Sequence, residues 1–370
     1  MGNINTLYKQ YIIPTVMVGS LTVGAGMFAL PYVFSKSGLF VGSIYLIFFT
    51  LIFIKINTQY AKIIATRSSK YRFVSYANKY LGKWGYWLSI IAVVVGLLLT
   101  LTIYVVLSSS FWELISSSGQ GLSNYLFWGV SALAVAMSLK KLLNLDTFLS
   151  MAMIAIIMFI SFLGTRDGIP STTPDNTLPG LLLPYGAVLF ALYGRAAIGP
   201  LEDYYKSARI AWKKATVPIA LGTAIPAILF LLFAIGIIGL SPSGVTTDAV
   251  SGILNNALLP LPLLGILGLL TIWTSYIVIG TEIKDVLAND LKLHNTFALL
   301  VVSAVPILLY IINIGSFVTL VGIAGAIFLA IECALVILMH GKLKGDLSLS
   351  DKLVIGLLIA GALHTFITTF

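Results

Sequence analysis

The chain has 370 residues, of which 59% are apolar and only 9% charged, and its mean hydropathy is +1.02. This composition leaves little sequence for a soluble domain and is typical of a membrane protein. The net charge of +9 does not indicate a nucleic-acid partner, because the basic residues lie in short segments between apolar stretches. The single cysteine, Cys333, excludes an internal disulfide framework.

Hydropathy predicts an all-α integral membrane protein with about eleven transmembrane helices in a single transport domain, 1–370. The spans are expected at about 12–34, 39–64, 84–112, 124–139, 146–164, 179–201, 215–240, 259–283, 295–312, 316–339 and 352–369.

The basic residues predict the orientation of these spans. If the N-terminus is cytoplasmic, Lys36 and Arg166 lie outside, Lys55 and Arg195 lie within spans, and every other lysine and arginine is on the cytoplasmic side. This distribution follows the positive-inside rule, so we expect the C-terminus to be extracellular.

The first span contains residues that interrupt a helix. Gly24 and Gly26 have low helix propensity, and Pro31 lacks a backbone donor. Lipid does not solvate free backbone groups, so such a break is expected where the chain lines an enclosed cavity or a ligand. We therefore expect a binding site here, and a β-branched residue at Gly24 or Gly26 is expected to abolish binding without unfolding the protein.

Two loops carry apolar residues at helical spacing. The first, before span three, contains Phe73, Tyr76, Ala77, Tyr80 and Leu81. The second, before span eight, contains Ala249, Ile253, Leu254, Ala257 and Leu258. Each loop has two interpretations. The first loop is either an interfacial helix or a helix packed permanently on the bundle. The second is either an external lid or, again, a helix packed permanently on the bundle.

A second interruption lies in span six, where Gly194 and Arg195 stand near the middle and Gly199 and Pro200 near the end. It follows the first break by five spans. Since five is odd, the second set of spans enters the membrane from the opposite side, which is the inverted-repeat arrangement of many secondary transporters. We therefore expect repeats at about 12–164 and 179–339, and an extra helix at 352–369.

Both breaks carry specific motifs. These are Gly24-Ala-Gly-Met-Phe-Ala-Leu-Pro31 followed by Ser37-Gly38, then Phe190-Ala-Leu-Tyr-Gly194 and Gly199-Pro-Leu-Glu202. The pattern resembles the amino acid/auxin permease and aromatic amino acid permease branches of the amino acid-polyamine-organocation superfamily. The resemblance implies the leucine-transporter-type fold, with broken helices one and six and alternating access around a central amino acid.

The resemblance also implies a substrate site at the two breaks. The half-helix after Gly26 offers amide donors to a carboxylate, and carbonyls around Val23 and Leu192 can accept from an ammonium group. The substrate-binding candidates are Val23, Gly24, Ala25, Gly26, Thr100, Tyr104, Phe190, Leu192, Tyr193 and Gly194. Any single aromatic residue among them also fits ordinary core packing. A neutral, large or aromatic L-amino acid is the implied substrate.

Sodium-coupled relatives hold a cation between spans one and eight. Here the matching residues are Ser20 and Val23, then Thr271, Thr274 and Ser275, whose oxygens suit a hard cation. The alternative is that these hydroxyls bond their own helices. Some proton-coupled members carry a lysine on span five, and Asp146 to Gly164 contains none, which favours Na⁺ over H⁺.

Three charged residues within spans have separate interpretations. Lys55 is expected to snorkel to the interface. Glu332 requires a proton or a cationic partner and is the candidate proton carrier. Arg195 has three possible roles: to face the substrate pathway, to bond free carbonyls or to hold a gate. Four other acidic residues are interpreted as cytoplasmic end charges, with a gate as the minor alternative: Glu202, Asp203, Glu282 and Asp285.

Taken together, these features predict an amino acid symporter in the plasma membrane. The sequence has no phosphate-binding loop and no metal-spaced histidines or carboxylates, so we expect neither an enzyme nor a cofactor, only a coupling ion, Na⁺ or H⁺. The alternatives are a non-transporting amino acid receptor and a channel-like protein. The sequence does not predict the oligomeric state.

Overall fold

The computed structural model describes residues 7–66, 73–116, 120–137, 143–166, 168, 170, 172, 174–253 and 259–369, without side-chain detail for 120, 143–150 and 369. Every regular element within these ranges is helical. The prediction of an all-α protein is therefore confirmed for the described part of the chain.

The helices are α2 (Ile13–Thr22), α3 (Leu30–Ser37), α4 (Leu39–Ile64), α5 (Phe73–Ile90), α6 (Gly96–Ile115), α7 (Gln120–Ala136), α8 (Leu143–Gly164), α9 (Leu178–Leu182), α10 (Pro184–Ala191), α11 (Ile198–Ser207), α12 (Thr216–Leu240), α13 (Leu261–Asp285), α14 (Asn295–Ile311), α15 (Phe317–Ile323), α16 (Ala330–Lys344) and α17 (Leu349–Thr369). Short 3-10 or π-helical segments are η1 (Tyr8–Ile12), η2 (Ala25–Ala29), η3 (Ile91–Val95), η5 (Arg195–Ala197), η6 (Trp212–Ala215), η7 (Ser251–Ile253), η8 (Val286–Asp290) and η9 (Ala324–Leu329).

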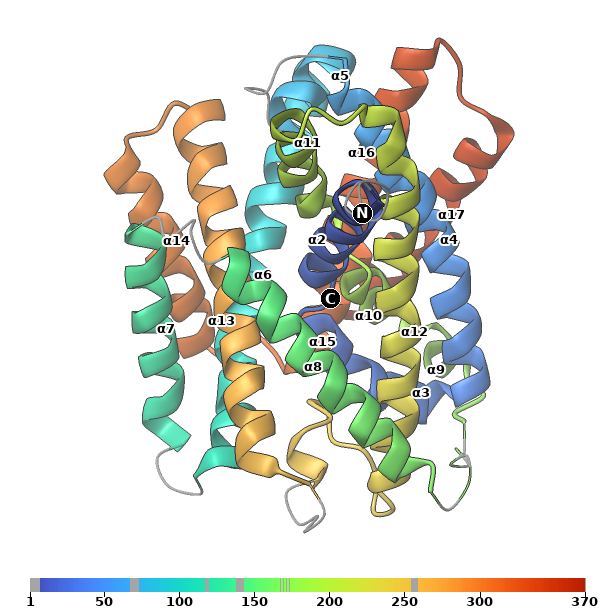
Figure 1. The fold of residues 1–370 in the computed structure, drawn as a ribbon, viewed down its shortest axis with the longest axis vertical. Helices are drawn as coiled ribbons and strands as arrows, with labels where there is room; N and C mark the ends of the chain where they lie inside the picture. The colour runs from blue at the N-terminus through green and yellow to red at the C-terminus, as the bar shows by residue number, and fades with distance from the viewer. Residues whose placement is uncertain are drawn as a thin grey trace.

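Within the described residues, seven helices are long and apolar enough to cross a membrane, and one bent helix pair makes an eighth if it is counted as a single span. Three shorter apolar helices, Gly121–Ala136, Met151–Gly164 and Asn295–Ile311, lie where the sequence predicts further spans. Most of these helices run along the long axis of the molecule, whereas α8 crosses in front of them obliquely (Figure 1). The chain is a multi-pass helical bundle.

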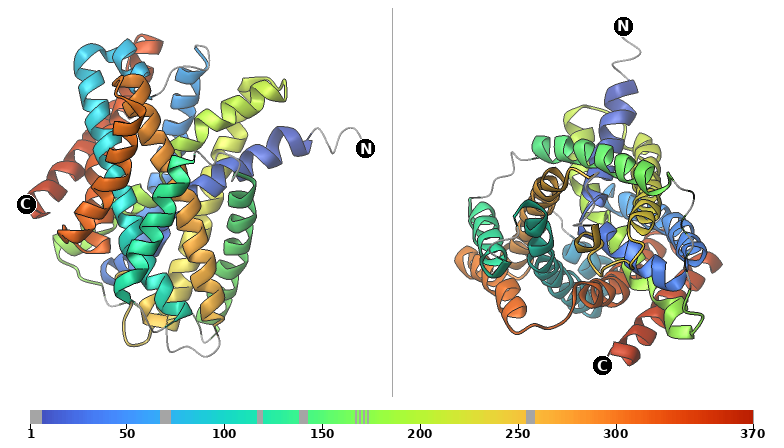
Figure 2. Two further views of the ribbon diagram at one scale, coloured as in Figure 1. Left: turned by 90° about the vertical axis from the view of Figure 1, so that its left-hand side faces the viewer. Right: turned by 90° about the horizontal axis from the view of Figure 1, so that it is seen from below.

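The first span is broken as predicted. The segments Tyr8–Thr22 and Ala25–Ser37 meet at an angle of 52°. Between them Val23 (ψ 97°) and Gly24 (φ −141°, ψ −160°) are extended, so the helical hydrogen-bond ladder is interrupted there. The segment before the break leans outwards from the bundle (Figure 2).

The predicted sixth span is also broken. Helix α10 ends at Ala191, and the chain resumes a helical course in η5 and α11. At Gly194 the dihedrals are φ −127° and ψ 7°, outside the helical region. Two broken helices therefore occupy the positions that the sequence predicts for them.

The loop before span three forms the first part of α5. The chain turns at Gly82, where φ is +73°, and continues through η3 into α6. Phe73, Tyr76 and Ala77 are at most 2% exposed, whereas Lys79 is exposed. This apolar stripe is packed on the bundle, so the second interpretation of this loop is correct.

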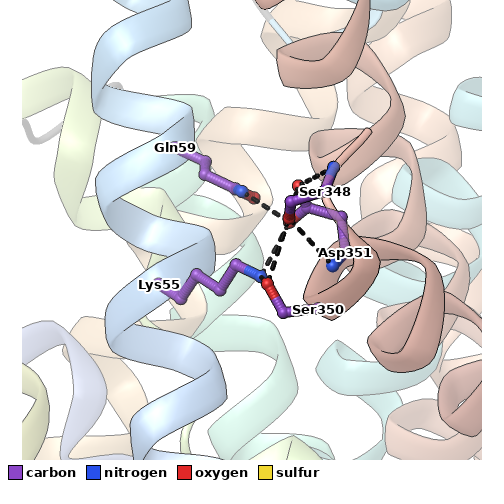
Figure 3. Close-up of polar contacts among 5 residues, drawn as sticks. All are labelled: Lys55, Gln59, Ser348, Ser350 and Asp351. Carbon is purple, nitrogen blue, oxygen red and sulfur yellow. Dashed lines mark hydrogen bonds and ion pairs between the residues drawn. The ribbon is translucent and has the colours of Figure 1, made fainter. Parts of the chain in front are cut away.

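Helix α17 packs beside α16 and lies at one edge of the molecule (Figure 2). Its start is held by Asp351, which accepts the backbone N–H of Ser348 (3.1 Å) while Ser348 Oγ accepts the N–H of Asp351 (3.2 Å). This reciprocal pair is a capping box. The same carboxylate binds Lys55 Nζ at 2.7 Å and Gln59 Nε2 at 2.9 Å (Figure 3). The expectation that Lys55 snorkels to the interface stays a prediction, and Asp351 at the start of α17 is the acidic partner within its reach.

Some sequence predictions lie outside the described residues. They concern the basic residues Arg67, Lys70, Arg72, Lys140 and Lys141, and Leu254, Ala257 and Leu258 of the second apolar loop. Of that loop, the short segment Ser251–Ile253 is helical, and Ala249 and Ile253 are buried.

Candidate functional site

The two helix breaks touch each other. A Cβ atom on Gly26 would lie 2.5 Å from Ala191 Cα, and one on Gly194 would lie 2.6 Å from Thr22 Oγ1. At Gly26 only glycine permits the two backbones to approach so closely, whereas the neighbour of Gly194 is a side-chain hydroxyl. The sequence thus brings the unwound segments together in the middle of the bundle.

A cavity opens beside this junction and encloses, with adjoining solvent-open space, about 530 Å³. Both breaks, α6 and α13 contribute to its wall. The lining residues are Leu21, Thr22, Gly24, Ala25, Gly26, Thr100, Tyr104, Phe190, Ala191, Tyr193, Ala196, Ser275, Val278 and Ile279. The wall is apolar and aromatic with a few hydroxyl groups, which is the usual character of a small-molecule site.

Most of the substrate-binding candidates share this cavity. Gly24, Ala25, Gly26, Thr100, Tyr104, Phe190 and Tyr193 line it. Val23 and Leu192 are buried beside the breaks and, like Gly194, are not among the lining residues. Sequence reasoning missed Val278 and Ile279, although they follow Ser275 by three and four residues and therefore share its helix face.

The cation-site candidates are only partly brought together. Ser275 lines the cavity, whereas Ser20, Thr271 and Thr274 do not. Their hydroxyls donate within their own helices: Ser20 to Met17 O (3.3 Å), Thr271 to Leu267 O (2.7 Å) and Thr274 to Thr271 O (3.0 Å). A hydroxyl that donates its proton in this way keeps oxygen lone pairs for another ligand.

A group of charged side chains lies directly beside the cavity. Arg195 binds Glu332 through Nε, and its Nη2 donates to Glu282 Oε1 at 2.9 Å and to the Tyr193 hydroxyl at 2.8 Å. We call Tyr193, Arg195, Glu282 and Glu332 the charge cluster. Its members come from the second break, α13 and α16.

The charge cluster is buried. The side chains of Arg195, Glu282 and Glu332 are 6%, 16% and 2% exposed. The guanidinium also stacks near aromatic rings, 4.5 Å from the centroid of Phe73 and 5.5 Å from that of Tyr60. Arg195 is the cationic partner that Glu332 requires, and the expectation that Glu282 is a cytoplasmic end charge is wrong.

Glu202 is also largely buried, with a side chain that is 10% exposed, but it has a different partner from Glu282. It pairs with Lys206 one helical turn further along α11, at 2.9 Å, and the lysine side chain is 48% exposed.

Comparison with known proteins identifies the family. The sequence profile of the family described as "Transmembrane amino acid transporter protein" matches residues 15–240, which include both breaks. No curated protein matches the chain.

Solved structures show which fold the chain has. A variant of the manganese transporter of Eremococcus coleocola is 13% identical, with a TM-score of 0.66 over 98% of this chain and 86% of that one. Mhp1 in its inward-facing conformation is 12% identical, with a TM-score of 0.60 over 87% of this chain and 75% of that one. A second structure of Mhp1, a nucleobase-cation-symport-1 family transporter, shows a closed conformation with bromovinylhydantoin bound. It is 10% identical, with a TM-score of 0.61 over 87% of this chain and 76% of that one.

These structures share the leucine-transporter-type fold, so the fold implied by the two breaks is confirmed. Family and fold indicate a membrane transporter rather than an enzyme. The chain belongs to the transmembrane amino acid transporter family, within the amino acid-polyamine-organocation superfamily.

Proposed function

We propose that the protein is a secondary active transporter that imports a neutral, large or aromatic L-amino acid by ion-coupled symport. The observation that carries this proposal is the cavity formed where the two breaks meet, in a chain that belongs to an amino acid transporter family. Unwound backbone in a membrane protein is tolerated where it faces such a cavity.

The backbone at the breaks recognises the part common to all amino acids. The start of the segment Ala25–Ser37 presents amide donors and a positive dipole end to the carboxylate. Carbonyls near Val23 and Leu192, beside Gly194, accept from the ammonium group. These are the contacts that alternating access would make and break.

The cavity wall selects the side chain of the substrate. Thr100, Tyr104, Phe190 and Tyr193 supply apolar surface and hydroxyls. None of the fourteen lining residues given above carries a charge. A charged substrate side chain would lose its hydration there without gaining a partner, so a neutral amino acid is favoured.

The coupling ion is either Na⁺ or H⁺. Sodium would use oxygens of Ser20, Val23, Thr271, Thr274 and Ser275, between the first span and α13. A proton would instead use Glu332, which is buried beside Arg195. Each route makes substrate binding depend on its own ion, since coupled ligands affect each other's binding reciprocally.

For the topology, we propose eleven spans with inverted repeats at 12–164 and 179–339 and an extra helix at 352–369. The N-terminus is cytoplasmic and the C-terminus extracellular, because the basic residues then follow the positive-inside rule. The proposed location is the plasma membrane.

A binding screen tests the substrate class. The purified protein is heated with each of the twenty amino acids in turn, since a ligand that binds the native state raises its unfolding temperature. We expect stabilisation by large neutral amino acids. Stabilisation by lysine or arginine alone would contradict the proposed pocket.

A further inference from the structure

The charge cluster has unequal numbers of opposite charges. One guanidinium, that of Arg195, faces two carboxyl groups, those of Glu282 and Glu332. If both carboxyl groups were ionised, a net negative charge would remain in a buried site. Such an unpaired charge is strongly disfavoured away from water, so the buried cluster is balanced when it holds one extra proton.

The second oxygen of Glu332 marks a position for that proton. Its Oε1 binds Arg195, while its Oε2 is buried and accepts no hydrogen bond within the described structure. An ionised oxygen in this setting has lost its hydration without replacement. Glu282, with a side chain that is 16% exposed, is nearer to water and can exchange a proton with it.

The charge cluster connects the cavity to a lysine-bearing surface helix. On one side, Tyr193 lines the cavity and accepts from Arg195. On the other, the Phe73 ring at the start of α5 covers the guanidinium, and α5 carries the exposed Lys79. Arg195 itself stands one residue after Gly194, at the start of the second half of the broken span.

We propose that the charge cluster is the proton-coupling site of the transporter. The buried cluster holds one proton on the Glu282–Glu332 pair. When the second half of the broken span moves and water reaches the cluster, both carboxylates become hydrated and the proton passes to cytoplasmic water. This inference rests on the proposed function and selects H⁺ from its two possible ions.

The other ionisable groups near Glu332 do not replace this pair. Tyr193 and Tyr60 face the guanidinium, and Cys333 is its buried neighbour on α16. Phenols and thiols are uncharged near neutral pH when buried, so they leave the charge imbalance unchanged.

The number of charges in the charge cluster predicts how two of its variants behave in transport. Glu332→Gln and Glu282→Gln each leave one carboxylate with one guanidinium, so each cluster is balanced without a proton. Both variants should therefore bind and exchange amino acids but lose coupling to the proton gradient. Glu202→Gln is the matched control, because Glu202 lies on the same broken span and pairs with Lys206 instead.

The experiment uses proteoliposomes without sodium, a parallel set that contains sodium, and a radiolabelled mixture of the twenty amino acids. An inward gradient of about one pH unit supports up to about tenfold accumulation for one coupled proton. We expect wild type and Glu202→Gln to accumulate label, and both cluster variants to equilibrate without accumulation. Exchange of internal for external label, measured without a gradient, shows that each variant is folded and binds substrate.

The outcomes separate the two proposals. Acid-driven accumulation by either cluster variant, or wild-type accumulation that requires sodium and ignores pH, would overturn the proton site and leave the transporter proposal intact. Absence of both exchange and accumulation in the wild type, with sodium present or absent, would overturn the transporter proposal and the inference that rests on it.

Discussion

Gly24 and Gly26 stand two residues apart in the first break, and a side chain at each would meet different neighbours. A Cβ on Gly26 would collide with the backbone of Ala191, whereas one on Gly24 would meet only the Tyr104 hydroxyl, at 3.7 Å. The extended dihedrals of Gly24 are accessible to any residue. The expectation that both glycines respond alike is therefore wrong.

Gly24→Val should fold normally and bind amino acids at least about tenfold more weakly, because its methyl groups occupy the cavity. Gly26→Val is the contrasting variant: it should be destabilised by about 1–3 kcal/mol through overpacking against Ala191. Thermal unfolding and equilibrium binding distinguish the two effects. Wild-type affinity in Gly24→Val would remove Gly24 from the site.

Asp248, in the loop before α13, makes a pH-dependent contribution to the stability of the fold. Its burial raises the pKa, but hydrogen bonds from Ser110, Ser251 and Thr246 outweigh burial and hold the pKa below its usual 3.8. A carboxyl with a lowered folded-state pKa stabilises the fold above its unfolded pKa and loses that effect as the pH falls through the folded pKa.

Asp248→Asn should lower the free energy of unfolding by about 1–2 kcal/mol at pH 6, since hydrogen bonds to the charged group are lost. Below about pH 4 the difference from wild type should shrink, because the wild-type carboxyl becomes protonated as well. Unfolding temperatures of both proteins from pH 6 down to about pH 2 test this. A difference that is constant with pH would contradict the role of the charge.

The local sequence could predict the helix breaks but not the ion-pair partners of the buried charges. Glycine and proline act on their own backbone, so the breaks at Gly24 and Gly194 follow from short motifs. Glu282 and Glu332 are 87 and 137 residues from Arg195, and only the folded bundle brings them together. A charge in an apolar span indicates that a partner exists and does not identify it.

At the scale of elements, α17 depends on few contacts. Only 11% of its most apolar window is buried, in contrast to 78% for the Phe73–Ile115 segment. The capping box at Ser348 and Asp351 and the bonds from Lys55 and Gln59 hold its start against α4 (Figure 3). The Ser-x-x-Asp spacing is visible in the sequence, whereas the contact with α4 depends on the tertiary fold.

Asp351→Ala should therefore destabilise the attachment of α17 by about 1–2 kcal/mol, through loss of the cap and of the Lys55 pair. Lys352→Ala is the matched control, since Lys352 is the exposed neighbour of Asp351. Limited proteolysis of the segment before α17 measures the effect. Equal cleavage rates in the two variants would show that Asp351 does not anchor the helix.

At the scale of the whole molecule, hydropathy could predict the helical bundle because the membrane requires long apolar helices. The family and fold comparisons agree with the two breaks at matching positions. The loop helix before span three was predicted as well: the non-helical Gly82 (φ +73°) separates residues 73–81 from the span that runs through η3 into α6.

Uptake into sealed proteoliposomes tests the central claim, that the cavity at the two breaks carries amino acids across the membrane. Wild-type protein is predicted to accumulate radiolabelled amino acids above the external concentration, saturably, until the ion gradient is dissipated. Gly24→Val is predicted to take up at least about tenfold less label at subsaturating substrate. Binding without accumulation would indicate a receptor. Uptake that does not saturate and never exceeds the external concentration would indicate a channel, and either result would contradict the account.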